Sequence, residues 1–351
     1  MSARLSFPLS ALLVLAALNA AHAADPITLI NVKDPGPNKK DEPILKQFSL
    51  EKAVHFLDSA SLTWQKKRGC FTCHTNLAYL YARPQVSSDV PAHRSVRQFA
   101  EQLVKVRWPK KGPRWDAEVV ATAAALAFND AATTGKLHPV TKTALDKMWP
   151  LQNEQGGWDW LKCDWPPMES DDHYGVTLAA LAVGVAPGDY AKTPKAKKGM
   201  SDIRRYFSNN PPPTLHHEAM LLWANAHGTN VLSDKEQKSI TEKLLAIQNK
   251  DGGWNLPSLG NWEREDKKPQ DTKTSDGYAT GFVIFVLREA GVPAKNHRIQ
   301  KGIAWLKRNQ RASGRWYTRS PYMDSRHYIS HAGSAFAVMA LAKCGELKAK
   351  K

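Results

Sequence analysis

The sequence predicts an all-α fold, an α/α toroid of about six helical hairpins that forms a double-layered helical barrel. Two observations carry this prediction. Three segments run from a helix into a glutamine, a Gly-containing turn and a tryptophan, at residues 152–158, 248–254 and 310–316. A helix ending that recurs along a chain is typical of stacked helical hairpins. Amphipathic segments also alternate with segments that are apolar almost all round, as expected for outer and inner helices.

Six helical pairs follow one another along the chain, at about 50–85, 93–130, 138–187, 198–229, 234–291 and 296–345. In the fifth pair, residues 240–247 are amphipathic and belong on the outer layer, whereas in the third pair residues 176–183 are apolar and belong inside. Because glycine readily adopts the left-handed conformation at a helix C-terminus, inner helices are expected to end at Gly184, Gly228, Gly291 and Gly345. The polar segment 255–274 predicts a loop over one mouth of the barrel.

The N-terminus has the features of a cleavable secretory signal. A short basic start precedes an apolar run at residues 9–18, which is too short to span a bilayer, and Ala21-His22-Ala23 is a small-residue cleavage site. We therefore expect residues 1–23 to be a signal peptide and the protein to be periplasmic or secreted. The remaining boundaries are an extended arm at 24–48, the toroid at 49–346 and a basic tail at 347–351.

The net charge of +16 arises from lysines scattered along the chain. Basic and aromatic residues do not alternate along one stripe, so nucleic acid is not an expected partner. A solvated basic surface is the simpler interpretation. The alternative is attraction to an anionic membrane surface, giving peripheral membrane contact, or to an acidic redox partner.

The first hairpin carries Cys70-Phe71-Thr72-Cys73-His74, the spacing that attaches a c-type haem. In such a site both cysteines bind the porphyrin covalently and the histidine is a ligand of the iron. The predicted cofactor is therefore a covalent haem c held by Cys70, Cys73 and His74. A structural thiol pair or a zinc site is the alternative. Cys163 and Cys344 remain as a disulfide or as two buried thiols.

Turns that precede inner helices lie at the same end of a toroid, so His74 is expected to share a mouth with the other inner-helix starts. Those starts are polar: Asp116, Glu118, Glu169, Asp171, Asp172, His173, His216, His217, Glu218, Asp276 and His331. The distal ligand or proton-relay candidates are His173, His216, His217 and His331, with Met148, Met168 and Met323 as thioether alternatives. Acidic residues also occur at helix N-termini as caps, whatever the function.

The repeats resemble those of the squalene cyclase and protein prenyltransferase superfamily. Residues 301–306, followed by Gln310, Gly314 and Trp316, look like a complete QW motif, and residues 112–115 look like a decayed copy. The resemblance implies that each Gln side chain hydrogen-bonds backbone groups at neighbouring helix ends while the Trp stacks over it. It also implies a hydrophobic, isoprenoid-like ligand.

The segment from Glu169 to Asp172 resembles the D-x-D-D motif of class II cyclases, which also opens an inner helix. The resemblance implies that Glu169 stands at the first position, that Asp171 is the acid that protonates an alkene or epoxide, and that Asp172 is the last. Crowded carboxylates raise one another's pKa, as a proton donor requires. Nearby aromatic rings would stabilise a carbocation: Trp158, Trp160, Trp165 and Tyr174. The chain departs from this family in having Glu at the first position and one toroid rather than two.

The zinc prenyltransferases of the same superfamily take zinc from a D-x-C motif and a later histidine. Here Asp276-Gly277-Tyr278 has tyrosine in place of the cysteine, although His331 matches the histidine. Without the thiolate, the zinc site lacks its activating ligand.

Three classes of function follow from the sequence. The first is an exported haem c protein that binds or transforms a hydrophobic ligand, or transfers electrons, at the haem-bearing mouth. The second is a class II terpene cyclase-like isomerase that uses Glu169, Asp171 and Asp172. The third is a non-catalytic binding scaffold.

Overall fold

The computed structural model describes residues 25–347 except 72, 164, 326 and 327, and it confirms the predicted all-α toroid. The outer helices of the six hairpins are α1 (Leu50–Arg68), α3 (Pro91–Gln102), α6 (Pro139–Met148), α8 (Pro194–Asn209), α10 (Asp234–Ala246) and α12 (His297–Arg308). The inner helices are α2 (Ala78–Ala82), α5 (Asp116–Thr133), α7 (Asp172–Val185), α9 (Leu215–Ala226), α11 (Gly277–Glu289) and α13 (Ile329–Lys343). The short helix α4 (Trp108–Lys111) extends the outer layer after α3.

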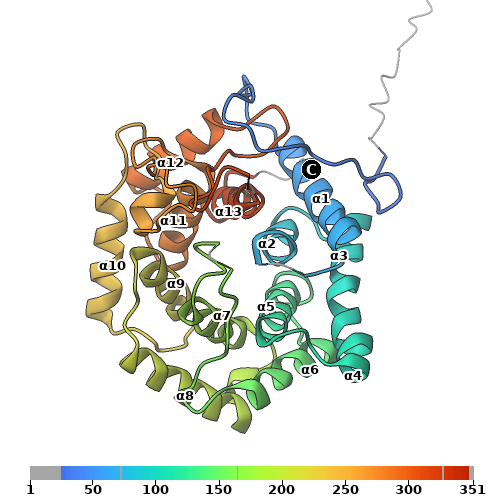
Figure 1. Ribbon diagram of the computed structural model, residues 1–351. Coiled ribbons are helices and arrows are strands. Elements are labelled where there is room, and N and C mark those ends of the chain that lie inside the picture. The colour runs from blue at the N-terminus through green and yellow to red at the C-terminus, as the bar shows by residue number, and fades with distance from the viewer. Residues whose placement is uncertain (1–24, 72, 164, 326–327, 348–351) are drawn as a thin grey trace, which may run out of the picture.

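The inner helices form a closed ring. Each packs against the next one along the chain, from α2 to α13, and α13 packs against α2. Figure 1 shows this ring, with the outer helices arranged around it. All six hairpins run from the outer to the inner layer, so the inner helices begin at one mouth. This arrangement places residues from six separate parts of the sequence around a common opening.

The glutamine–tryptophan turns connect successive outer helices. Each glutamine Nε2 donates to the glycine carbonyl of its own turn and to a carbonyl of the next outer segment: Gln152 to Gly156 and Gly199, Gln248 to Gly252 and Arg298, and Gln310 to Gly314 and Ser49. Each indole N–H donates to a carbonyl of the preceding outer helix, from Trp158 to Met148, Trp254 to Leu244 and Trp316 to Leu306. The glutamines thus satisfy backbone carbonyls at helix ends, as the resemblance implies. The third turn joins the last hairpin to the first and closes the outer layer.

Residues 25–48 contain no helix and lie along the last hairpin. The Leu45 amide donates to the Gln310 carbonyl at 2.8 Å. Arg315 lies over the ring of Phe56 and donates to the carbonyls of Pro35 and Gly36. Because the Arg315 side chain is almost fully buried, these contacts fix residues 34–37 firmly against the end of the toroid.

Three of the four predicted glycine helix ends are confirmed. Gly228, Gly291 and Gly345 all have positive φ directly after an inner helix. The prediction for Gly184 is wrong, because α7 continues to Val185. A side chain there would lie 2.8 Å from Thr229 Cγ2 and 2.9 Å from His227 Cβ, so glycine is needed for close packing rather than for a turn.

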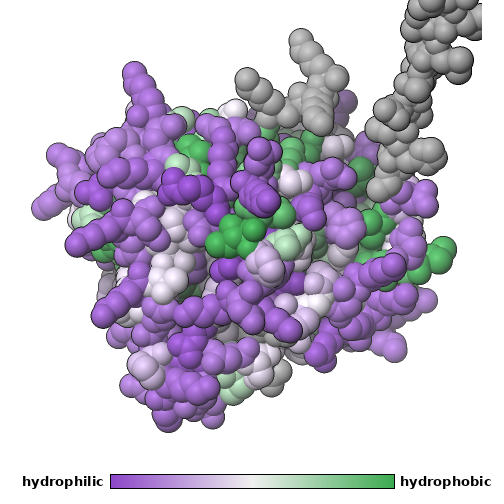
Figure 2. Space-filling model, turned by 90° about the horizontal axis from the view of Figure 1, so that it is seen from above, coloured by the Kyte–Doolittle hydropathy of each residue, from purple (hydrophilic) through white to green (hydrophobic). Residues whose placement is uncertain are grey.

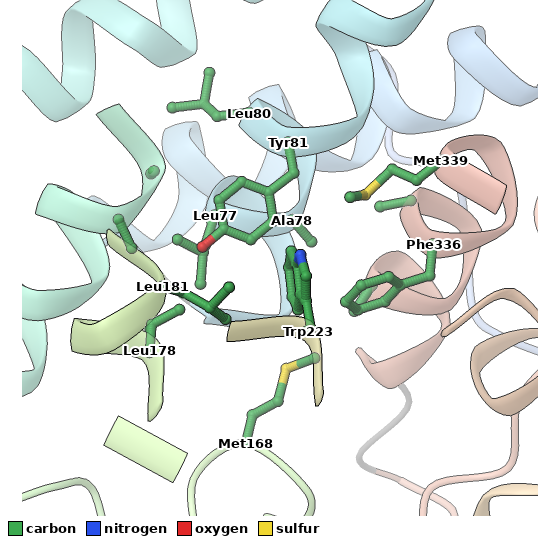
Figure 3. Close-up of a cluster of buried hydrophobic side chains, with 14 of the residues drawn as sticks. Leu77, Ala78, Leu80, Tyr81, Met168, Leu178, Leu181, Trp223, Phe336 and Met339 are labelled. Atoms are coloured by element: carbon green, nitrogen blue, oxygen red, sulfur yellow. The ribbon is translucent and has the colours of Figure 1, made fainter. Parts of the chain in front are cut away.

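Side chains fill the centre of the ring. Trp223 from α9 lies at its middle, with ring centroids 5.1 Å from Phe285, 6.0 Å from Phe336 and 5.9 Å from Tyr81. Figure 3 shows the rings of Tyr81, Trp223 and Phe336 gathered from different inner helices, with Met168 below them. Such packing leaves the mouth, rather than the centre, as the place for a hydrophobic ligand.

The face of the molecule shown in Figure 2 is mostly hydrophilic, with small separate apolar patches. None of the helices in the described part of the chain is long and apolar enough to cross a membrane. Cys163 and Cys344 remain thiols, and Cys163 is exposed, so neither the predicted disulfide nor a pair of buried thiols is present. The predicted signal peptide and most of the predicted basic tail lie outside the described residues.

Candidate functional site at one mouth of the toroid

Side chains from the starts of five inner helices meet at one mouth. Hydrogen bonds or close charge contacts join residues of different hairpins: His74 with Glu169, Thr75 with His331, His217 with Asp171, His216 with Tyr278, and Thr318 with Asp276. The sequence therefore located the mouth correctly. These contacts join the residues around the mouth into separate groups rather than into one continuous ring.

His74 is the second residue of a turn of π-helix, Cys73–Leu77, that leads into α2. Its Nδ1 lies 2.8 Å from Thr75 Oγ1, and this hydroxyl lies 3.0 Å from Nδ1 of His331. On the other side of the ring, Nε2 lies 3.9 Å from Oε1 of Glu169. The hydrogen bond at Nδ1 fixes the ring orientation, so Nε2 is the nitrogen directed toward the mouth.

Aromatic side chains enclose the His74 ring. Trp64 meets it edge-on at 4.8 Å, Tyr328 stacks on it at 5.3 Å, and Trp165 lies 6.2 Å away. A cavity of about 30 Å³ separates His74 and Tyr328 from Met168 and Glu169. Burial lowers the pKa of His74 to about 3, so its imidazole is neutral at pH 7.

Glu169 is a carboxyl group at this mouth that is suited to donate a proton. Its side chain is 8% exposed, and burial raises its pKa to about 7. At neutral pH a substantial fraction of this carboxyl is therefore protonated. The resemblance assigns this position to the first residue of the acidic motif, not to the acid itself.

The pKa of Asp171 is shifted in the opposite direction, below its ordinary value. Burial alone would raise its pKa, but Asp171 accepts hydrogen bonds from the Tyr174 amide and the Ser170 hydroxyl and lies 3.0 Å from His217 Nε2. These contacts hold the pKa of Asp171 at about 2. The expectation that crowding raises this pKa is wrong, because an imidazole and helix N–H groups surround the carboxylate instead of other carboxylates.

Asp172 stabilises the loop before α7. Its Oδ1 accepts a hydrogen bond from the Trp160 amide at 2.9 Å and lies 3.4 Å from Nζ of Lys162. Both partners lie in the loop that precedes the helix.

The predicted histidines take different places. His331 joins His74 through Thr75, whereas His217 lies between Asp171 and the Thr214 hydroxyl. His216 is fully buried, with Nε2 2.9 Å from the Tyr278 hydroxyl. His74 and His331 therefore form one group, and His216 and His217 bind other partners.

Asp276 and Tyr278 form a structural network at the start of α11. Asp276 accepts hydrogen bonds from the Ala279 amide and the Thr318 hydroxyl, and burial nevertheless raises its pKa to about 7. No group of three or more His, Cys, Asp or Glu residues in the described ranges is placed to hold a metal ion.

The segment predicted to attach a haem lies between α1 and the π-helical turn. Cys70 is partly buried, its carbonyl accepts a hydrogen bond from Trp64 Nε1 at 3.1 Å, and burial raises the pKa of its thiol. Thr72 and the side chain of Cys73 lie outside the described part of the chain. Among the methionine candidates, Met168 lines the cavity beside His74, whereas Met148 is fully buried in α6.

Of the four aromatic residues expected near the acidic motif, one lines this cavity, Trp165. Trp158 donates its indole N–H to the Met148 carbonyl at the end of α6, and Trp160 donates to the Met168 carbonyl. Both rings are buried.

Comparison with known proteins agrees with this architecture. Residues 219–345 match the family model described as the squalene-hopene cyclase C-terminal domain. This part of the chain is similar to that domain. One similar protein is the squalene–hopene cyclase of Zymomonas mobilis, which is 23% identical over 290 residues, covering 68% of this chain and 41% of that protein.

A solved polysaccharide lyase superposes on 86% of this chain and 99% of its own, with a TM-score of 0.53 and 8% identity. At that identity the likeness shows the fold alone. The chain spans 41% of the length of the curated cyclase that it matches.

Sequence reasoning did not identify the residues that surround His74. Trp64 lies on the outer helix α1, and Tyr328 follows the long segment after the third tryptophan turn. Neither belongs to a motif, and only tertiary packing brings them to His74. Thr75 had a weak signal, because a hydroxyl next to a histidine can bond to its ring.

Replacing Asp171 with asparagine is expected to lower the free energy of unfolding by about 1–2 kcal/mol at pH 7. The folded-state pKa of about 2 lies below the ordinary value of 3.8, so this contribution is present above about pH 4 and is lost as the pH falls toward 2. Urea unfolding of both proteins from pH 7 to pH 2.5 measures the difference. The exposed Asp159→Asn variant is the control, and parallel pH profiles for wild type and Asp171→Asn would contradict the ion pair.

Proposed function

We propose that this protein is an exported haem protein built on a squalene cyclase-like toroid. It holds a c-type haem covalently through Cys70 and Cys73, with His74 as an axial ligand, and it transfers electrons at this mouth. A redox partner with an acidic surface would complement the net charge of +16.

The environment of His74 carries this proposal. Its imidazole is buried, Thr75 fixes its Nδ1, and its Nε2 faces a cavity lined by Trp165, Met168 and Glu169. A neutral histidine with one nitrogen fixed by a hydrogen bond and the other directed into a mostly apolar cavity is the arrangement that metal-ligating histidines adopt.

Cys70, Cys73 and His74 are the residues that would hold the haem. The cavity at Nε2 of His74 has a volume of about 30 Å³, so its lining must move apart to admit the porphyrin. When bound, the haem supplies one-electron redox chemistry. Thr75 and His331 orient the ligand ring, while Trp64, Trp165 and Tyr328 exclude water from it. Because the toroid centre is filled, any hydrophobic molecule that is oxidised or reduced here approaches from the mouth.

The test is a visible absorption spectrum of protein produced in a periplasm that attaches haem, recorded oxidised, reduced and after denaturation with pyridine. We expect a c-type spectrum that survives denaturation, and its loss in a Cys70→Ser/Cys73→Ser variant. Protein that folds after export without covalent haem would overturn the proposal.

A second candidate is acid catalysis at the same mouth. The raised pKa of Glu169, beside the aromatic rings of Trp165 and Tyr328, favours a proton donor facing an apolar substrate. The matching cyclase is named for squalene, so an isoprenoid hydrocarbon is the substrate class to test.

Incubation with squalene and analysis of the hydrocarbon products by mass spectrometry tests this candidate. Acid catalysis predicts cyclic products from wild type and none from Glu169→Gln, with the haem spectrum intact in both. If neither redox activity nor products are found, the remaining function is that of a non-catalytic binding scaffold.

A further inference from the structure

A pocket of about 370 Å³ lies between the N-terminal arm and the outer helix α1, next to the His74 site. The arm contributes Asp34 to Pro37, α1 contributes Trp64 and Arg68, and Tyr328 and His331 complete the lining. The buried Arg315 holds this part of the arm in place through the carbonyls of Pro35 and Gly36. The pocket therefore has fixed walls, and its volume falls in the range of small-molecule sites.

Aromatic rings form one side of this pocket. The rings of Trp64 and Tyr328 lie 4.9 Å apart at 77°. The lining is mostly apolar, and Ala60 contributes a flat surface on α1. Rings arranged in this way bind flat aromatic molecules by stacking and edge contacts.

A positive charge lies at the rim. The Arg68 guanidinium lies 5.6 Å from the Trp64 ring centroid and 3.4 Å from the Tyr328 hydroxyl. Lys67 is paired with Asp34, but within residues 25–347 as described no carboxylate lies at ion-pair distance from Arg68. An anionic group on a bound molecule would supply that partner.

The same two rings connect this pocket with His74. Trp64 and Tyr328 contact the His74 ring at 4.8 and 5.3 Å, and Cys70 follows Arg68 by two residues. The cavity at Nε2 of His74 holds only about 30 Å³, which is too small for a large cofactor. The pocket beside the arm is the space of ligand size that adjoins it.

We propose that this pocket binds a flat aromatic ring system bearing a carboxylate, with Trp64 and Tyr328 against the rings and Arg68 on the carboxylate. The chain's own haem does not fit here, because Cys70, Cys73 and His74 do not line the pocket. The ligand is therefore a free aromatic acid, and this inference does not rest on the proposed function.

The experiment titrates the Cys70→Ser/Cys73→Ser chain, which cannot attach haem, with protoporphyrin IX and follows porphyrin fluorescence. We expect saturable binding to one site. Arg68→Ala should raise the Kd about fivefold, the scale of one exposed ion pair. Lys110→Ala, which removes an exposed lysine on α4, should leave the Kd unchanged.

Thr63→Phe is the decisive variant. Thr63 lines the pocket and its buried hydroxyl makes no hydrogen bond to any described residue, so the larger ring fills the space without breaking a contact. We expect the Kd to rise more than tenfold while the circular dichroism spectrum stays unchanged. Binding that is absent in the parent chain, or equal in the Thr63→Phe chain, would overturn the proposal.

Wild-type protein with covalent haem separates this proposal from the proposed function. Because the haem and the pocket use different residues, protoporphyrin is expected to bind to the wild type with the same Kd. Loss of that binding would show that the haem occupies the pocket and would overturn the proposal. Failure of haem attachment in the exported wild type would remove the proposed function but would leave the titration of the double variant interpretable.

Discussion

Replacing Gly314 with alanine is expected to destabilise the fold by about 3 kcal/mol or more. Gly314 has φ +96°, and an added Cβ would lie 2.0 Å from the Lys52 carbonyl oxygen of α1. The backbone on both sides is fixed, because Gln310 donates to the Gly314 and Ser49 carbonyls. The substitution therefore separates the last hairpin from the first, where the outer layer closes.

Thermal and urea unfolding, followed by circular dichroism, measure this effect. Gly345→Ala is the matched control, because Gly345 also has positive φ, +76°, but an added Cβ would meet nothing within 4 Å. Its expected cost is about 1 kcal/mol, from the backbone conformation alone. If both variants lose the same free energy of unfolding, the contact between Gly314 and α1 adds nothing to stability beyond the cost of the backbone conformation.

Replacing His74 with alanine is the second change with a large expected effect. Under the proposed function, the variant attaches haem through Cys70 and Cys73 but loses the native axial ligand, so its absorption bands shift and its redox activity disappears. The midpoint potential should shift strongly, because the axial ligand is one of its main determinants. Spectra and potentiometric titration of the exported protein check both results.

A purely structural role for His74 has a different signature. A second variant, His74→Gly, leaves a space that added imidazole can enter. Imidazole restores the native spectrum of this variant only if the His74 ring is an iron ligand. His55→Ala, an exposed histidine on α1 of the same hairpin, is the control and should behave as wild type. A His74→Ala variant with the wild-type spectrum would rule out axial ligation.

The acidic motif shows where a local pattern stops being informative. Glu169 and Asp171 are two residues apart, and the sequence gives both the same expected chemistry. Their pKa values move in opposite directions because Glu169 faces an apolar cavity and Asp171 faces His217 and the start of α7. The burial and the partner both come from other hairpins, so no local pattern contains them.

The sequence by itself determined the hairpin order, the closed ring and the shared mouth. Those features follow from short-range rules, since Gln310, Gly314 and Trp316 satisfy and shape a helix end wherever that pattern occurs. Tertiary structure alone decided that aromatic rings fill the centre, that Trp64 and Tyr328 enclose His74, and that the arm forms a pocket with α1. Trp64 with Tyr328, Trp223 with Phe285 and Arg315 with Gly36 are far apart in the sequence, and the geometry of these contacts depends on the packing of the whole ring.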